Sequence, residues 1–310
     1  MTIAEADGMR LAYIAEVTEG TTPATPAFQI LRYTGESIVA TKNTVISAEV
    51  TPSKNLTDVI HAGDSISGGF EGELSYGTYD ALLEGLFRSA WSTNVLINGI
   101  TRKSFTFEKT AEQGATDSFM RYRGCFINSM SLDISDRSAI KAGFEIMGMG
   151  VDDGAAAIIT GATYVAANTN EIMPSGTYVG TIAVGGIAAL PAIRGVSLQI
   201  SSNNREQTQV GSNDLAGVAV GRFEVTGTLS CYFTNIELYN AIRDHDSATI
   251  TIPLGLITGE KYTLELPAVR FLGGDPIGGG NGQDVAFDVE FQAIYDATTV
   301  GTMKITRAVA

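Results

Sequence analysis

Cysteine, histidine and tryptophan are scarce in this chain of 310 residues, which has two, two and one of them. Two cysteines do not make a disulfide framework, so Cys125 and Cys231 are predicted to be buried, reduced thiols. The histidines, His61 and His245, are far apart, and no nucleophile motif accompanies either. The sequence therefore predicts no catalytic, cofactor or metal site, and we do not expect an enzyme.

Long apolar runs and positive charge are also lacking. No run reaches the length that spans a membrane. The opening stretch MTIAEADGMRLAYIAEV lacks a basic segment followed by an apolar one, so we expect no signal peptide. Lysine and arginine total 20 against 34 acids, a net charge of −14. Tight binding of nucleic acid is disfavoured, because phosphate contacts need lysine and arginine.

Two stretches resemble ligand sites without the context that such sites need. GGNGQDVAF (279–287) resembles one calcium-binding nonapeptide, but that motif works in tandem arrays whose turns share each ion. Asp244, His245 and Asp246 are consecutive, and consecutive residues rarely face one metal. We predict a flexible loop at the first stretch and a solvated turn after a helix at the second.

Glycine, by contrast, is abundant, with 35 residues, and short runs of alternating apolar and polar residues fill the chain. Such runs, separated by glycine-rich turns, predict antiparallel β structure. The length suffices for two domains, and 44% hydrophobic residues allow each of them a core.

One strand-and-helix pattern occurs twice, in ISGGFEGELSYGTYDALLEGLF (66–87) and VGRFEVTGTLSCYFTNIELYNAIRD (220–244). Each begins with strict alternation, typical of a half-buried strand, and continues with apolar residues at helical spacing. Three further strand patterns follow in the same order in both halves. The matching segments are 104–110 and 249–255, 119–128 and 262–271, 139–148 and 284–293, and upstream, less closely, 45–50 and 195–200.

We interpret this shared order as an internal duplication; the alternative is that alternating strands resemble one another by chance. The boundaries that it predicts are a first domain over 39–150 and a second over 194–310. Residues 151–193, small, apolar and almost uncharged, lie between them. They are predicted to form a linker hairpin that packs on the second half, or a surface that a neighbouring subunit covers.

The stretch IAEVTEGTTPATPAFQILRYTGESI (14–38) resembles the opening of the tail tube, or major tail, proteins of long-tailed, non-contractile bacteriophages (siphophages). The matching residues are Glu16, Gly20, Thr21, Pro23, Pro26, Phe28, Leu31, Arg32, Gly35, Glu36 and Ser37. The strand–helix–strand order of both halves extends the resemblance over nearly the whole chain.

The resemblance implies a mainly β fold of two tandem tail-tube-like domains. Each would consist of two packed antiparallel sheets, as a β-sandwich or barrel, with a short flanking helix. In that family one sheet joins those of neighbours around a lumen. Single-domain members form hexameric rings, and two-domain members form homotrimeric rings with pseudo-sixfold symmetry. The duplication favours the two-domain type.

The function that the resemblance implies is that of a structural virion protein whose stacked rings form the tail tube, the conduit for DNA ejection. The implied partners are further copies of the chain, a tape measure protein inside, tail terminator and distal tail proteins at the ends, and double-stranded DNA that passes without specific binding. No membrane or cofactor is implied, and the location is the virion tail, after assembly in the host cytoplasm. The alternative is a decoration or adhesion β-sandwich on the virion surface.

The stretch 14–30 is rich in threonine and proline and poorly suited to a core, so we expect the N-terminal segment 1–38 to be an arm that reaches an adjacent subunit or ring. The candidate residues of this inter-subunit arm are Glu16, Gly20, Pro23, Pro26, Phe28 and Arg32.

Carboxylates recur on the polar side of the predicted strands of both halves. They would line the lumen as a negative wall, which repels DNA phosphates evenly and lets DNA slide, or they would face solvent outside. Alternation alone does not distinguish an inner from an outer surface, and Lys141 shares the strand face of Glu145. The candidate lumen-facing acids are Glu71, Glu73, Glu145, Glu224, Asp288 and Glu290.

Overall fold

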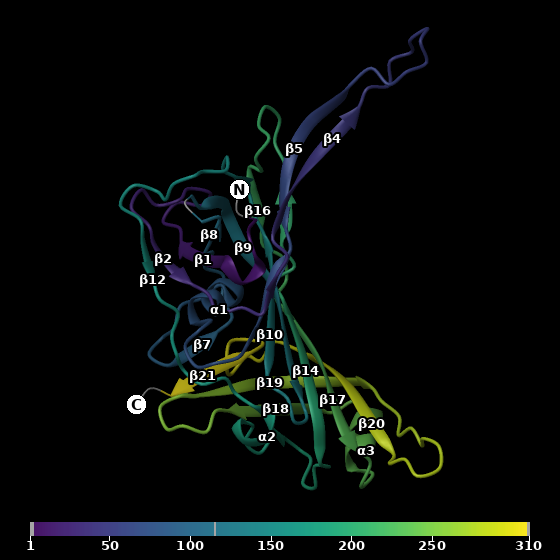
Figure 1. Ribbon diagram of the computed structural model, residues 1–310. Helices are drawn as coiled ribbons and strands as arrows, with labels where there is room; N and C mark the ends of the chain where they lie inside the picture. The colour runs from purple at the N-terminus through teal and green to yellow at the C-terminus, as the bar shows by residue number, and fades with distance from the viewer. Residues whose placement is uncertain (1–2, 115, 309–310) are drawn as a thin grey trace.

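The computed structural model describes residues 3–114 and 116–308 and confirms a mainly β fold of packed antiparallel sheets (Figure 1). Three α-helices and one short 3-10 helix, Ala6–Gly8, accompany the strands of the described residues, and the sheets there do not close into a barrel. None of these helices is long and apolar enough to cross a membrane.

The first sheet belongs to the N-terminal half and has the order β12-β2-β1-β8-β9-β11. Its pairs are antiparallel except β12 with β2, which is parallel. The strands are β1 (Met9–Ala15), β2 (Ala27–Ile30), β8 (Phe105–Ala111), β9 (Ser118–Ser135), β11 (Gly150–Val151) and β12 (Thr163–Val165).

The second sheet, called here the long sheet, joins both halves in the antiparallel order β3-β6-β10-β9-β14-β17-β20-β19. The long strand β9 takes part in both sheets, its first part in the first sheet and its second part in the long sheet. The other strands are β3 (Gly35–Glu36), β6 (Gly69–Glu73), β10 (Lys141–Met147), β14 (Ile193–Ser201), β17 (Glu224–Tyr232), β19 (Lys261–Gly273) and β20 (Ala286–Ala293).

A third group of strands packs across the long sheet in the C-terminal half, where β18 and β19 cross the direction of β14 and β17 (Figure 1). In this group β18 lies between β13 and β19, and β21 lies between β19 and β7. The strands are β7 (Val95–Ile97), β13 (Ala183–Val184), β18 (Ser247–Leu254) and β21 (Lys304–Ala308). The C-terminal strand β21 thereby returns to the first half.

Two antiparallel ribbons extend from the long sheet. The long ribbon, β4 (Val39–Ile46) with β5 (Val59–Ser67), projects from the top of the molecule in Figure 1. The short ribbon, β15 (Arg205–Gln207) with β16 (Gly217–Ala219), lies between β14 and β17 in the chain. The long ribbon lies likewise between β3 and β6, so the ribbons occupy corresponding places in the two halves.

The two predicted helices are present as α1 (Asp80–Phe87) and α3 (Glu237–Asp244), and α2 (Ser175–Tyr178) is a single turn. Leu82, Leu83 and Leu86 of α1 are buried, as their spacing predicts. Each of α1 and α3 ends at a residue with left-handed backbone, Arg88 and His245, which ends the helix in the same way.

One continuous hydrophobic core serves both halves. Between the sheets, the rings of Phe70 on β6 and Phe107 on β8 lie 5.9 Å apart. The two halves therefore depend on each other for burial.

Both cysteines are free and buried, as predicted, and burial raises the pKa of Cys231 to about 11, so this thiol stays protonated at neutral pH.

The structure differs from two sequence-based expectations. The segment 1–38 supplies β1, β2 and β3, with Leu11 and Phe28 buried, because the apolar pattern around β1 and β2 outweighs the intervening Thr/Pro turn. The segment 151–193 packs on both halves, since β12 pairs with β2 and β13 with β18.

The upstream match of 45–50 with 195–200 is wrong. Residues 45–50 lie in the long ribbon, and β3 is the strand that occupies the place of β14, at the side of β6 away from β10. The order β3-β6-β10-β9-β8-β1 in the first half is then matched by β14-β17-β20-β19-β18-β13 in the second.

Candidate functional site

The long sheet has one buried face and one polar face, and the polar face is the candidate site. Residues such as Phe144, Leu132 and Leu198 are buried on one side, as strand alternation requires. The polar face carries all six candidate acids of the sequence analysis. Their cross-strand partners place them there: Glu71 faces Gly143, Glu73 faces Lys141, Glu145 faces Ser129, Glu224 faces Ser201, Asp288 faces Ser230 and Glu290 faces Thr228.

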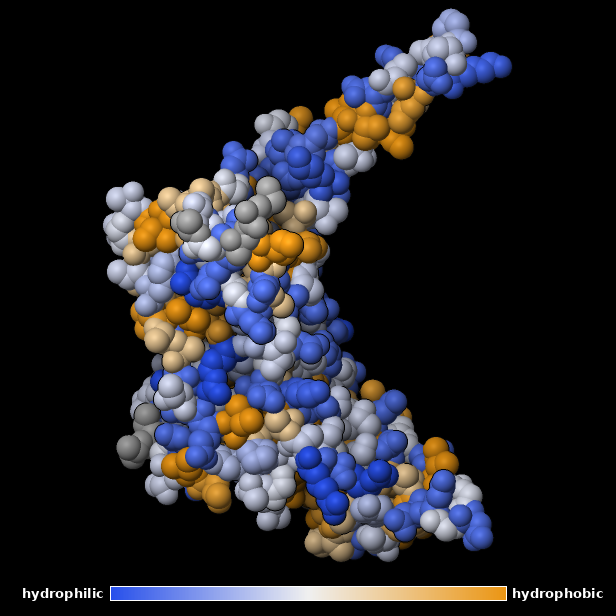
Figure 2. All heavy atoms as spheres, viewed as in Figure 1, coloured by the Kyte–Doolittle hydropathy of each residue, from blue (hydrophilic) through white to orange (hydrophobic). Residues whose placement is uncertain are grey.

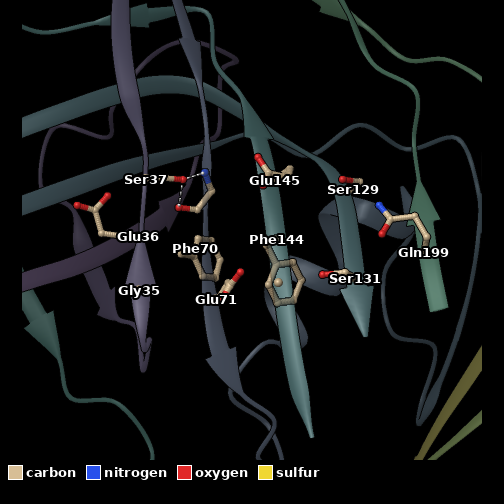
Figure 3. A pocket seen from close by; sticks show the side chains of 12 residues that line it. Gly35, Glu36, Ser37, Phe70, Glu71, Ser129, Ser131, Phe144, Glu145 and Gln199 are labelled. Atoms are coloured by element: carbon tan, nitrogen blue, oxygen red, sulfur yellow. Dashed lines mark hydrogen bonds between the residues drawn. The ribbon is translucent and has the colours of Figure 1, made fainter. Parts of the chain in front are cut away.

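The polar face is hollowed where β3, β6, β10, β9 and β14 lie side by side (Figure 3). The hollow, of about 430 Å³, is bounded by Glu36, Glu71, Glu145 and Gln199 and is floored by small residues of β9 and β10. Gly143 cannot be enlarged there freely, since an added Cβ would lie 2.7 Å from the hydroxyl of Ser131. Serines and glycines keep this part of the face shallow and polar.

Carboxylates outnumber cations on the polar face. Lys141 lies between the cross-strand partners Glu73 and Asp133, so its charge is offset on both sides. Arg222 hydrogen-bonds Glu224 and, with a further hydrogen bond from Asn203, lowers the pKa of that carboxyl. A face of this composition provides no row of arginines for phosphates and is suited to weak, even repulsion of an anionic polymer.

Residues 3–114 and 116–308 hold no candidate metal site. Three or more His, Cys, Asp or Glu residues do not come together there in a way that could hold a metal ion. His61 contacts Asp64 within the long ribbon, and His245 ends α3 in the exposed turn that the sequence predicted.

The junction between the halves is made by β9 and β14. Residues Gly195–Ser201 of β14 pair with Ser135–Ser129 of β9 over seven residue pairs. The same edge of β9 is occupied further back by β8, whose last pair is Phe105 with Cys125. Thus β14 takes over the edge of β9 where β8 ends.

The corresponding edge in the second half is open. There β18 occupies β19 only as far as the pair Ser247 with Arg270. Beyond it, the described residues Phe271–Gly273 pair with β20 on one side and with no strand on the other. The counterpart of β14 is β3, which pairs with β6 alone among the described strands. Each chain therefore has two unpaired strand edges among its described residues: the end of β19 and the side of β3 away from β6.

The six candidate arm residues lie in the first half of their own chain. Glu16 accepts hydrogen bonds from Ser104 and Thr106 at 2.6 and 2.8 Å, and from the backbone N–H groups of Gly20 and Gly124. The ring of Phe28 stacks on Tyr164 at 5.7 Å.

Arg32 donates to the carbonyl of Asn170 at 2.6 Å, and Pro23 and Pro26 lie in the connection between β1 and β2. These contacts fix the segment in its own fold, and a contact with a second chain stays a prediction.

Sequence reasoning missed the serines of the polar face and both open edges. The serines carried a usable signal, because Ser129 and Ser131 alternate with buried Met130 and Leu132. The edges carried none, since pairing between distant strands leaves no local pattern.

Comparison with known families places the chain among tail tube proteins. The family model described as phage tail tube protein covers residues 7–293. The curated proteins contain no match to the chain.

Proposed function

The chain belongs to the phage tail tube protein family, and from this premise we propose that its copies pair edge to edge into rings that stack into the tail tube. Members of this family are structural proteins of the virion tail that assemble with themselves into a tube. The ring, its stoichiometry and the passage of DNA are the parts that we propose.

The observation that carries the proposal is the junction of β9 with β14. Each chain joins its own halves through this pairing and leaves the equivalent pair, the end of β19 and β3, unused. Pairing of β3 with the β19 edge of another copy would be heterologous, and such contacts close into a ring when the rotation per copy allows. Three chains, each filling two of six places, would make a homotrimeric ring with pseudo-sixfold symmetry.

The matching strand order of the two halves supports an origin by internal duplication. The domains would lie near 39–150 and 194–310, with β1 to β3 added to the first of them. The polar face of the long sheet would then line the lumen, and its carboxylates would let double-stranded DNA slide during ejection. A tape measure protein inside the tube, with terminator and distal tail proteins at its ends, completes the proposed set of partners, and assembly would take place in the host cytoplasm of a siphophage.

A cysteine pair across the proposed junction tests it. Gly35→Cys on β3 and Gly273→Cys at the end of β19 are suitable, because an added Cβ meets nothing within 4 Å at either glycine. Oxidation of assembled protein carrying both changes should give linked dimers and trimers, with no band above three chains. Light scattering of single rings should give a mass of three chains.

The matched control is a pair at the junction already present in the chain, Gln199→Cys with Ser131→Cys, which are cross-strand partners. It should link within the chain and leave the mass unchanged. Linked species of up to six chains would show that the ring is a hexamer and would contradict the proposed trimer. Rings without any link between chains would place the contact elsewhere, and a chain that stays monomeric at high concentration would rule out the tube.

A further inference from the structure

The long ribbon exposes apolar side chains that its own chain leaves uncovered. Val45 and Ile60 are cross-strand partners, as are Ile46 and Val59, and the two pairs lie on opposite faces of the ribbon. All four side chains are at least half exposed, and Figure 2 shows apolar surface along the projecting ribbon. An isolated two-stranded ribbon is marginally stable in water, and exposed apolar surface of this kind marks an interface.

In the short ribbon of the second half, the apolar side chains at the corresponding place are covered by the first half. Leu215 and Val218 of the short ribbon are buried against Phe126, Met147 and Met149 of the first half. The backbone N–H of Leu215 donates to the carbonyl of Met149 at 3.0 Å. An ion pair of Asp214 with Arg123 adds to this contact. The short ribbon thus crosses the β9–β14 junction and rests on the other half.

The long ribbon lies in the same relation to the open junction. Ile60 precedes Phe70 of β6 by as many residues as Leu215 precedes Val225 of β17. Phe70 and Val225 are both buried on the core side of their strands. Ile60 is therefore the counterpart of Leu215, although it is 52% exposed and Leu215 is 6% exposed.

A counterpart of the methionine surface exists in the second half. Met147 and Met149 lie at the end of β10, and the residues that follow β20 are Ile294 and Tyr295, 39% and 61% exposed. The turn after them is held by paired backbone hydrogen bonds between Asp296 and Gly301. The chain therefore carries both an uncovered apolar ribbon and an uncovered apolar surface.

We propose that the long ribbon docks on a second copy of this chain, with Val45 and Ile60, which share one face of the ribbon, packing on Ile294 and Tyr295 of the neighbour in the same ring. The contact repeats between chains what Leu215 makes within one. It deepens the proposed function and rests on it, since the neighbour is the copy whose β19 edge receives β3.

Disulfide trapping between two single variants tests the contact. Ile60→Cys and Tyr295→Cys are expressed separately, one with an affinity tag, then mixed, assembled and oxidised. A linked heterodimer should form in single rings. It should be absent at protein concentrations too low for rings to assemble. The native cysteines are buried and do not interfere. The control pairs Ile60→Cys with Ile100→Cys, a loop residue that is 91% exposed and outside the proposed contact, and should give no link.

A second measurement follows assembly itself. Ile60→Asp should raise the concentration needed for ring formation by tenfold or more, because it removes one buried apolar side chain from each contact. The same change at Ile100 should leave that concentration unchanged, and both variants should keep the circular dichroism of the parent.

The outcomes separate this inference from the proposed function. Rings of normal mass without the 60–295 link overturn the ribbon contact and leave the ring intact. A link that forms in stacked tubes but not in single rings also overturns it, because the ribbon would then contact another ring. Failure of the parent chain to form rings removes both.

Discussion

A buried carboxylate ties the segment between the halves to the first sheet. Glu108 on β8 is fully buried and accepts from Arg121 Nε at 2.7 Å and from the Tyr164 hydroxyl at 2.5 Å. Burial is the main cause that raises the pKa of Tyr164, and the hydrogen bond to Glu108 is the second. The hydroxyl therefore remains a donor at neutral pH. Because a buried charge without partners is costly, the three side chains act as a unit.

Removing the cation tests this unit. Arg121→Met should lower the free energy of unfolding by about 3–5 kcal/mol, since it leaves the buried carboxylate of Glu108 without its cationic partner. The double change Glu108→Met with Arg121→Met should recover most of the loss. Denaturant unfolding at neutral pH measures both. Arg222→Met, at a pair whose arginine is 80% exposed, is the control and should cost less than about 1 kcal/mol. Equal losses at the two arginines would contradict the argument.

At the scale of elements, β1 and the long ribbon differ in what they contribute. The strand β1 pairs with β8 along seven residues, and every residue of β8 is buried. The strand β4 of the ribbon is exposed at every residue. The N-terminal strand therefore belongs to the core of the subunit, whereas the ribbon is available for contacts outside it.

Two deletions should separate these contributions. Removing residues 1–38 should abolish cooperative thermal unfolding, because it uncovers β8 and removes β1, β2 and β3 together. Replacing the ribbon tip 48–57 by a two-residue turn should shift the melting temperature by only a few degrees, because the tip buries little. Thermal circular dichroism compares the two. If the chain lacking 1–38 melts like the parent, this segment does not belong to the core of the subunit.

At the scale of the whole molecule, the long sheet joins the two halves and has one polar face. The strands of the long sheet are antiparallel to their neighbours, and the register runs without a shift where β6 pairs with β10, β9 with β14 and β17 with β20. Acids from both halves therefore end on the same side. Repeated around a ring, this face would be the negative wall of the lumen.

Charge reversal on this face tests its position in the virion. Glu71, Glu73, Asp288 and Glu290, all changed to lysine, should permit tube assembly but slow DNA ejection, because lysines bind the passing phosphates. The effect should be larger at low salt, where screening is weak. The control reverses four exposed acids away from the face, Glu5, Asp7, Glu112 and Asp153. Ejection from intact tails at the parent rate in the first variant would place the polar face outside the lumen.

The sequence by itself determined the mainly β class, the two strand–helix units and the division of residues between core and polar face. Strand and helix periods are local, so residues such as Phe70 and Glu71, or Leu82 and Leu86, show their environment in the order of their neighbours. The family resemblance, carried by the short stretch 14–38, was confirmed by a match over 7–293. The expectation that the segment 1–38 is poorly suited to a core did not hold, because its Thr/Pro turn concealed that strands flank it, and its contact with a second chain stays a prediction.

Only the tertiary structure decided which strands are neighbours. The pairing of β9 with β14, the return of β21 to β7 and the pairing of β3 with β6 join residues far apart in the chain. No periodicity records such contacts, since a strand exposes the same hydrogen-bonding groups to any partner. The edges left open and the apolar ribbon left uncovered follow from those pairings. They became visible only when each strand had been assigned its neighbours.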